Sequence, residues 1–281
     1  MSAEALQLCY RGWSGFEVRA PGGRTSLLID PAPGRAIADE RAVILLTHGH
    51  PEHVAGALAH LRQRSRAPVT VIASASICRY LERRAAGRED RFMRVAAGHR
   101  LDVLGWQVRA FGWTHMSLLP PGMLPAARYL ATLLRHPRGL ARMAWSDVRG
   151  PAHAPMLGYH VSAGEARIVY YGEGLHRLTS RHALEEALGP DPIDALVFGA
   201  EPEDLHALPA LLAGCEVGRA IAFEPHRPWR EDFGLPQLDA EDLVSRLSAA
   251  GLDALAMTAD QTVTVAARTA RELRRPDVRS V

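Results

Sequence analysis

Three histidines and a glutamate lie within the six residues HGHPEH, which begin at His48. The preceding run AVILL is typical of a buried strand, and the following EHVAGALAHLRQR has apolar residues near helical spacing. Neutral imidazole is the commonest protein ligand of zinc and also binds iron and manganese. The segment predicts a metal site in a loop between a strand and a helix. The alternative is a polar helix start in which Glu52 complements the helix dipole.

Strand and helix patterns alternate along the chain. The first part predicts hairpins, because LQLCYR, GFEVRA and TSLLID are separated by the turn sequences WSG and PGG. Beyond HGHPEH, predicted strands such as PVTVIA and DALVFG alternate with predicted helices such as ASICRYLERRA and EDLHALPALLAG. No linker divides them, so we expect one α/β domain over residues 1–281, with two packed sheets and helices outside. The Pro-, Leu- and Arg-rich segment 118–155 and the charged C-terminal tail 268–281 depart from the pattern.

Composition excludes several classes of function. The 33 basic residues are all Arg and face 31 acidic residues, so nothing favours nucleic-acid binding. The absence of Lys rules out P-loop and Schiff-base lysine chemistry. Cys9, Cys78 and Cys215 are too widely spaced to suggest a disulfide framework or a thiolate zinc site. With no signal-peptide pattern and no apolar stretch of ~20 residues, we expect a cytoplasmic protein.

Three further metal-capable side chains follow predicted strands. His115 ends FGWTH, Glu173 lies in YYGEG and His226 lies in FEPHRP. A single histidine at a strand end is more often a surface or hydrogen-bonded residue, so each is weaker evidence than HGHPEH. The histidines in predicted helices or turns are not expected to bind metal, and they are His60, His99, His182 and His206.

Together these segments resemble the metallo-β-lactamase-fold superfamily, whose hallmark is H-x-H-x-D-H after a buried strand. In HGHPEH, Glu52 takes the place of the usual Asp. SLLIDP, with Asp30, is similar to the family's strand and structural aspartate. FGWTH, YYGEG and FEPHRP are similar to the segments that carry its next histidine, its bridging carboxylate and its final histidine. The resemblance spans Ser26 to His226 and implies a four-layer αββα sandwich of two mixed β-sheets flanked by helices.

The resemblance also implies ligands and a reaction. One divalent ion would be held by His48, His50 and His115, and a second by Glu52, His53 and His226, with Glu173 as the bridge. We expect zinc, with manganese or iron also compatible, and Glu52 and Glu173 as catalytic carboxylates. A metal-bound hydroxide would cleave an ester, lactone or phosphodiester bond. Because Glu replaces Asp twice, occupancy of the second site stays open, as do an iron-dependent oxidoreductase and a non-catalytic binding module.

Within the superfamily, GWSGFEV and GYHVSAGEARIVYYGEG are most similar to the lactonase and phospholipase-D-like branch, which includes ascorbate-phosphate lactonases. The segment 118–155 is expected to form a lid or insertion. Its arginines alternate with Leu and Ala and would grip an anionic small-molecule substrate or touch anionic lipid; they are Arg128, Arg135, Arg138 and Arg142. The alternative is a helix packed on the core or on a second subunit, and the oligomeric state is open.

Overall fold

The computed structural model of the chain describes residues 5–23, 25–32, 41–63, 67–85, 89–115, 130–137, 139, 151 and 153–268. Most of the expected lid at 118–155 lies outside these residues, including Arg128, Arg138 and Arg142. The same holds for residues 269–281 of the expected tail.

The described strands form two sheets of seven. The first sheet has the order β14-β1-β2-β3-β4-β5-β6. Its strands are β1 (Ala5–Gly12), β2 (Gly15–Arg19), β3 (Thr25–Ile29), β4 (Arg41–Leu45), β5 (Val69–Ala73), β6 (Arg91–Arg94) and β14 (Thr262–Ala266). The second has the order β13-β12-β11-β10-β9-β8-β7. Its strands are β7 (Arg100–Val103), β8 (Trp106–Gly112), β9 (Leu157–Ala163), β10 (Ala166–Gly172), β11 (Ile193–Gly199), β12 (Val217–Phe223) and β13 (Ala254–Ala256).

Each sheet combines an antiparallel part with a parallel part. In the first sheet β1, β2 and β3 pair as hairpins, and β3 to β6 run parallel. In the second sheet β7 to β10 are antiparallel, and β10 to β13 run parallel. The parallel strands β4 and β11 are nearly continuous in buried apolar residues because both of their faces are covered. Both sheets are therefore mixed, as the sequence predicted.

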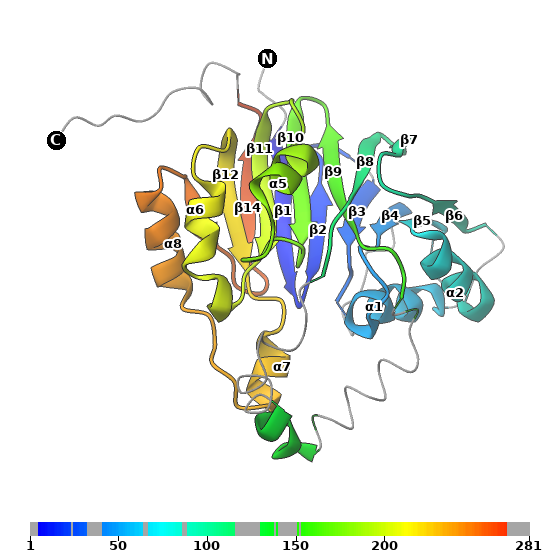
Figure 1. Cartoon of the computed structure of the whole chain (residues 1–281). Coiled ribbons are helices and arrows are strands. Elements are labelled where there is room, and N and C mark those ends of the chain that lie inside the picture. The colour runs from blue at the N-terminus through cyan, green and yellow to red at the C-terminus, as the bar shows by residue number, and fades with distance from the viewer. Residues whose placement is uncertain are drawn as a thin grey trace.

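Helices cover the outer faces of the sheets. The helices α1 (Pro51–Leu61) and α2 (Ala75–Ala85) pack on the first sheet through Val54, Ala57 and Leu81. On the second sheet lie α5 (Arg181–Leu188), α6 (Ala207–Leu212) and α8 (Ala240–Ala249). Between the sheets, side chains such as Leu8, Val43 and Tyr159 form a third apolar cluster. Figure 1 shows α5 in front of the second sheet, with α6 and α8 toward one side of the molecule and α1 and α2 toward the other. Because helices pack on the outer face of each sheet, the fold has four layers.

One local expectation needs correction, and three short elements were not predicted. The predicted continuous helix EDLHALPALLAG is divided into a 3-10 turn (Pro202–Asp204) and α6. Pro209 lacks the N–H that a longer helix would need and is tolerated only in the first turn of α6. These elements are the short helix α7 (Arg227–Asp232) and the strands β6 and β13. The helix has six residues and the strands have four and three, so none of them shows a clear periodicity.

Candidate metal centre

The histidine loop connects β4 to α1. His48 and His50 lie in the loop, His50 is the N-cap of α1, and Pro51 occupies its first turn. His53 follows on that same turn and is 1% exposed, while His48 is completely buried. A proline at the first helical position fixes the backbone for helix entry, because the missing N–H is unbonded there in any helix. The loop thereby directs three imidazoles toward the interior.

The structure brings six of the predicted site residues together. His115 comes after β8, Glu173 after β10 and His226 after β12, although the three lie far apart in sequence. Glu173 Oε2 lies 3.8 Å from His48 Nε2, 3.8 Å from His115 Nε2 and 3.3 Å from His226 Nε2. Glu173 Oε1 lies 3.0 Å from His53 Nε2. His50 is joined to them through His48, whose Nε2 is 3.1 Å from His50 Nδ1.

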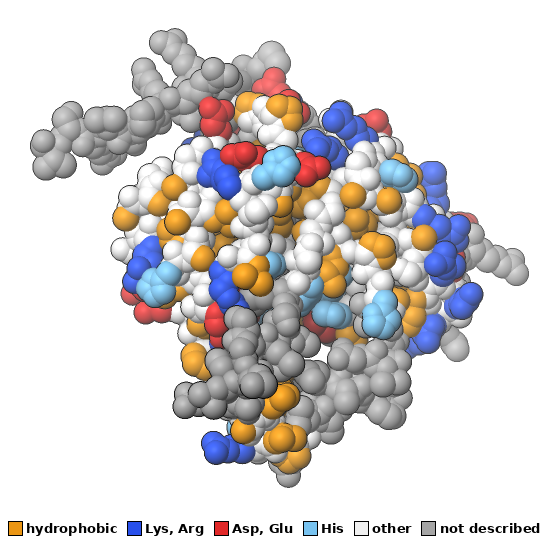
Figure 2. All heavy atoms as spheres, in the orientation of Figure 1, with side chains coloured by type: hydrophobic (Ala, Val, Ile, Leu, Met, Phe, Trp, Pro, Cys, Tyr) orange, Lys and Arg blue, Asp and Glu red, His pale blue; other side chains and the backbone are white. Residues whose placement is uncertain are grey.

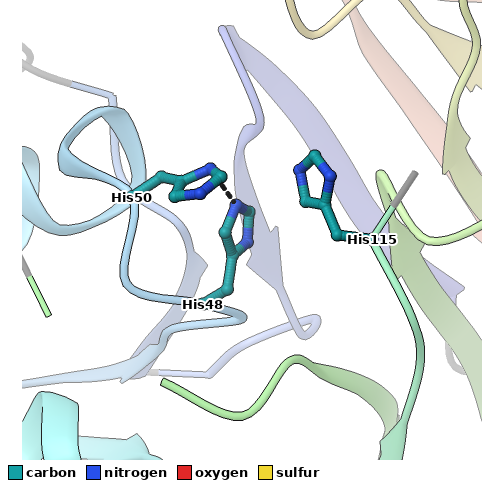
Figure 3. Close-up of side chains that lie close together, drawn as sticks. All are labelled: His48, His50 and His115. Atoms are coloured by element: carbon teal, nitrogen blue, oxygen red, sulfur yellow. Dashed lines mark hydrogen bonds between the residues drawn. The ribbon is translucent and has the colours of Figure 1, made fainter. Parts of the chain in front are cut away.

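His48, His50 and His115 form one group of converging donor atoms. Figure 3 shows His48 and His50 on one side and His115 opposite them, on the segment that follows β8. The ring centroids of His50 and His115 are 5.1 Å apart, and those of His48 and His115 are 5.7 Å apart. A second group consists of His48, His53 and Glu173.

Glu52 is placed differently from the other predicted ligands. Its Oε1 lies 3.7 Å from His50 Nδ1, and Glu52 belongs to neither of the two donor groups. Its side chain is 24% exposed, whereas the side chain of Glu173 is 4% exposed. A role for Glu52 as a ligand or a catalytic carboxylate therefore stays a prediction.

The donor set fits a divalent metal ion. Zinc lies about 2.0–2.2 Å from its N and O ligands, so neighbouring ligand atoms in a tetrahedron are ~3.3–3.6 Å apart. The separations of 3.1–3.8 Å among the imidazole nitrogens and Glu173 Oε2 bracket that spacing. Glu173 Oε2 is also buried without a well-formed hydrogen bond among the described residues. A buried carboxylate oxygen surrounded by imidazoles is the arrangement that a cation would complete.

Neighbouring groups fix which nitrogen of His48 faces the centre. The Thr47 hydroxyl donates its hydrogen to Asp30 Oδ2 at 2.6 Å and lies 2.9 Å from His48 Nδ1. Because the hydroxyl proton is already committed, Thr47 Oγ1 accepts from the Nδ1–H of His48. Burial holds the pKa of His48 well below its ordinary value, so the ring is neutral. The lone pair of Nε2 is then free to bind an ion.

Asp30 and Glu201 act in the same way on the other side of the centre. Asp30 Oδ2 lies 2.8 Å from His53 Nδ1, and Glu201 Oε1 lies 2.6 Å from His226 Nδ1. A carboxylate can only accept, so each holds a proton on Nδ1 and leaves Nε2 facing Glu173. Asp30 adopts φ 44°, a left-handed conformation that Asp tolerates better than most residues. The structural aspartate suggested by the resemblance therefore lies directly behind the histidine loop.

Glu173 carries the negative charge of the centre. Burial opposes its ionisation, but the nearby imidazoles of His226 and His53 outweigh burial and lower the pKa of Glu173 well below its ordinary value. Ser14 Oγ donates to Glu173 Oε1 at 2.6 Å and fixes the carboxylate plane. Oε2 is thereby turned toward His48, His115 and His226.

Three residues that support the centre were not predicted from the sequence, namely Ser14, Glu201 and Arg230. Arg230 is 6% exposed, and its Nη1 lies 2.6 Å from Glu201 Oε2. Glu201 follows the buried strand β11 by two residues, just as Glu173 follows β10, and this position at a strand end is a signal that could have found it. Ser14 and Arg230 carried no such signal, since one lies in a hairpin turn and the other in a helix of six residues.

A model of the Beta-lactamase superfamily domain matches residues 13–207, which is more than half of the chain. No curated protein matches the sequence. Within the described residues, no helix is both long enough and apolar enough to span a membrane.

Solved structures share the fold at low sequence identity. The metallo hydrolase Igni18 from the archaeon Ignicoccus hospitalis gives a TM-score of 0.60 at 14% identity, covering 92% of this chain and 98% of Igni18. The metallo-beta-lactamase fold protein YhfI from Bacillus subtilis gives 0.62 at 10% identity, covering 93% and 99%. The diiron beta-hydroxylase CmlA from Streptomyces venezuelae gives 0.56 at 15% identity, covering 95% of this chain and 54% of CmlA. The predicted αββα fold is confirmed.

Proposed function

Because this chain belongs to the beta-lactamase superfamily, we propose that it is a metal-dependent hydrolase that cleaves an ester, lactone or phosphodiester bond. The observation that carries the proposal is the convergence of His48, His50 and His115 with the buried carboxylate of Glu173. When bound, a divalent ion supplies a Lewis acid that polarises a substrate oxygen and lowers the pKa of water toward ~7. We favour zinc because imidazole dominates the donor set.

The residues of the site would have separate roles. His48, His50 and His115 would hold one ion, and His53, His226 and Glu173 face a second position. Thr47, Asp30 and Glu201 contact the Nδ1 atoms of His48, His53 and His226, so that the Nε2 atoms of these imidazoles are directed toward the centre. Ser14 orients Glu173. Glu52, whose side chain is 24% exposed and lies beside His50, would exchange a proton with a substrate or with solvent.

For the substrate, we propose the lactonase and phospholipase-D-like branch and an anionic small molecule. Two features of the sequence support this proposal, namely the GWSGFEV segment and the arginine-rich stretch 128–142. In that stretch Arg135 is described and exposed. Contact with anionic lipid remains a second use of the same arginines.

A second candidate function is iron-dependent oxidation. It is favoured by the likeness to CmlA, which is described as a diiron beta-hydroxylase. Imidazole and carboxylate donors suit iron as well as zinc. The metal content of the purified protein separates the two candidates, because hydrolysis proceeds with zinc whereas oxygen chemistry requires iron.

The test combines metal analysis with activity. Purified protein would be analysed for zinc, manganese and iron, then assayed on a chromogenic ester, a lactone and bis-p-nitrophenyl phosphate with each metal added. We expect His50→Ala to lose metal and at least 100-fold of the turnover while its circular dichroism stays unchanged. His99→Ala is the matched control, since His99 is exposed and outside both donor groups. A His50→Ala variant that keeps full metal content and turnover would overturn the proposal.

A further inference from the structure

A cavity far from the metal centre lies on the outer face of the second sheet. It has a volume of roughly 330 Å³ and is lined by β7 to β10 and by the residues that follow α5. Arg109, on its floor, lies three residues before the end of β8 at Gly112, and His115 follows three residues later. At about 3.3 Å per residue the strand part alone spans ~10 Å, and none of the candidate metal ligands lines the cavity. The cavity is therefore separate from the metal centre.

Strand register places polar side chains in two rows across the floor of this cavity. Arg100, Arg109 and His160 are direct cross-strand partners on β7, β8 and β9. In the second row Asp102, Gln107, Ser162 and Arg167 are partners in the same way. The alternate residues Val108 and Val161 point into the core between the sheets. Both rows thus face outward, where α5 ends at Leu188 and leaves the sheet uncovered.

The charges in the first row are unbalanced. Arg100 and Arg109 face each other directly, and like charges in that position are destabilising. No carboxylate of the described residues forms an ion pair with either guanidinium, while Arg167 Nη1 lies 3.7 Å from Asp191 Oδ1. The guanidinium of Arg109 lies near Gly189, which caps the C-terminal end of α5, and the partial negative charge of a helix end attracts a cation. Arg109 Nη1 is 3.0 Å from the position that a Cβ atom on Gly189 would occupy.

His160 does not add to the positive charge. Its Nε2 donates to the carbonyl oxygen of Ala187 at 2.6 Å. Burial lowers the pKa of His160, and the guanidinium of Arg109 acts in the same direction. The neutral ring forms one wall of the cavity, between the arginines and α5. Figure 2 shows basic side chains (blue) beside the upper ends of these strands, on the same face as α5.

We propose that this cavity binds a small molecule through an oxyanion group, either phosphate or carboxylate, held between Arg100 and Arg109. A guanidinium presents two parallel N–H groups that match such an anion, and an anion between the two arginines removes their repulsion. Ser162 and Gln107 supply neutral hydrogen-bonding groups on the second row. Asp102 and Asp191 limit the net positive charge, which favours a single anionic group over a polyanion.

The binding test is designed so that the anions cannot bind at the metal centre. Isothermal titration would be performed on chelator-treated protein carrying His50→Ala, with inorganic phosphate in one arm and succinate in the other, at fixed ionic strength. We expect one site per chain, and at least a 10-fold loss of affinity in Arg100→Gln and in Arg109→Gln. Arg91→Gln is the control, because Arg91 is an exposed arginine on the edge strand β6 of the other sheet. Heat of binding with phosphate but not with succinate would identify a phosphoryl group as the ligand. Heat of binding with both would show that the cavity accepts either anion.

A thermal measurement gives a second readout on the same variants. Without anion, Arg100→Gln should melt at a higher temperature than its parent, because the repulsion from Arg109 is removed. With 10 mM phosphate, the parent should gain more in melting temperature than Arg100→Gln. Absence of heat with both anions, or equal affinity in parent and Arg100→Gln, would overturn the proposal.

Discussion

Glu201 Oε1 lies 2.6 Å from His226 Nδ1, and the two residues follow the neighbouring parallel strands β11 and β12. Arg230 Nη1 holds the other carboxylate oxygen of Glu201 at 2.6 Å, so the carboxylate has little freedom to rotate. The imidazole of His226 is thereby fixed with Nε2 toward Glu173. A carboxylate behind a metal-binding histidine sets the tautomer and raises the basicity of the ring.

Glu201→Gln should therefore weaken metal binding at His226. An amide can present its NH₂ group to Nδ1, which would place the ring proton on Nε2. We expect affinity for the ion at this position to fall ~10–100-fold, measured by competition with a chromophoric chelator. Glu203→Gln is the control, because Glu203 contacts Arg230 from a side chain that is 47% exposed. An equal loss of affinity in both variants would show that Arg230, and not the tautomer of His226, matters.

Asp30→Ala should lower stability as well as activity. The carboxylate accepts from the N–H and the hydroxyl of Thr47 and contacts His53 Nδ1, and all of these groups are buried. Removing one partner of a buried charged network costs about 3–5 kcal/mol of the free energy of unfolding, measurable by urea denaturation. Asp102→Ala, at an exposed position without an ion pair among the described residues, should change it by less than ~0.5 kcal/mol.

Glu52→Gln tests the residue that departs from the family motif. Because Glu52 lies outside the group formed by His48, His50 and His115, the variant should keep the ion that these three hold. Turnover should fall, since a neutral amide cannot accept a proton. Metal stoichiometry measured beside Glu52→Asp separates the two effects. Loss of all bound metal in Glu52→Gln would make Glu52 a ligand of the first ion.

Gly56→Ala should destabilise the protein although alanine favours a helix. A Cβ at Gly56 would lie 1.7 Å from the carbonyl oxygen of Pro31, so α1 must move away from the loop that follows β3. We expect overpacking to cost about 2–3 kcal/mol of the free energy of unfolding, which outweighs the ~1 kcal/mol gain in helix propensity. Because α1 carries His53, metal affinity should fall as well. An unchanged denaturation midpoint would contradict the close packing of α1 on this loop.

Glu17 predicts a pH dependence of stability that is independent of the metal centre. Burial opposes its ionisation, but Arg11 and Arg19 outweigh burial and lower the pKa of Glu17 below its ordinary value. A folded-state pKa below the unfolded one adds stability above the unfolded value near 4.5, and this stability is lost as the pH falls through the folded-state pKa. Glu17→Gln should therefore be less stable than wild type at pH 7, and the difference should shrink below pH 4. A difference that stays constant from pH 7 to pH 3 would contradict the ion pairs.

The histidine loop illustrates what can be predicted from the sequence alone. A buried strand followed by HGHPEH already defines a strand, a loop and a helix with three inward imidazoles, because periodicity and residue chemistry are local properties. His115, Glu173 and His226 were predicted from the resemblance, and each also follows a predicted strand, where the ends of strands in parallel and mixed sheets gather at one edge.

What the sequence could not determine were the contacts between residues distant in the chain. Only the folded structure turns Glu173 Oε2 toward three imidazoles, places Glu201 behind His226 and leaves Glu52 beside His50 alone. The opposition of Arg100 and Arg109 likewise depends on strand register, which packing sets and composition does not. The sequence by itself predicted the fold class, which is confirmed, and the candidate donors, which stay a prediction, since both rest on short motifs and on the resemblance that these motifs carry. Only the tertiary structure decided which donor atoms meet, because a shift of one residue in register or one rotation of a side chain moves an atom by more than the length of a metal–ligand bond.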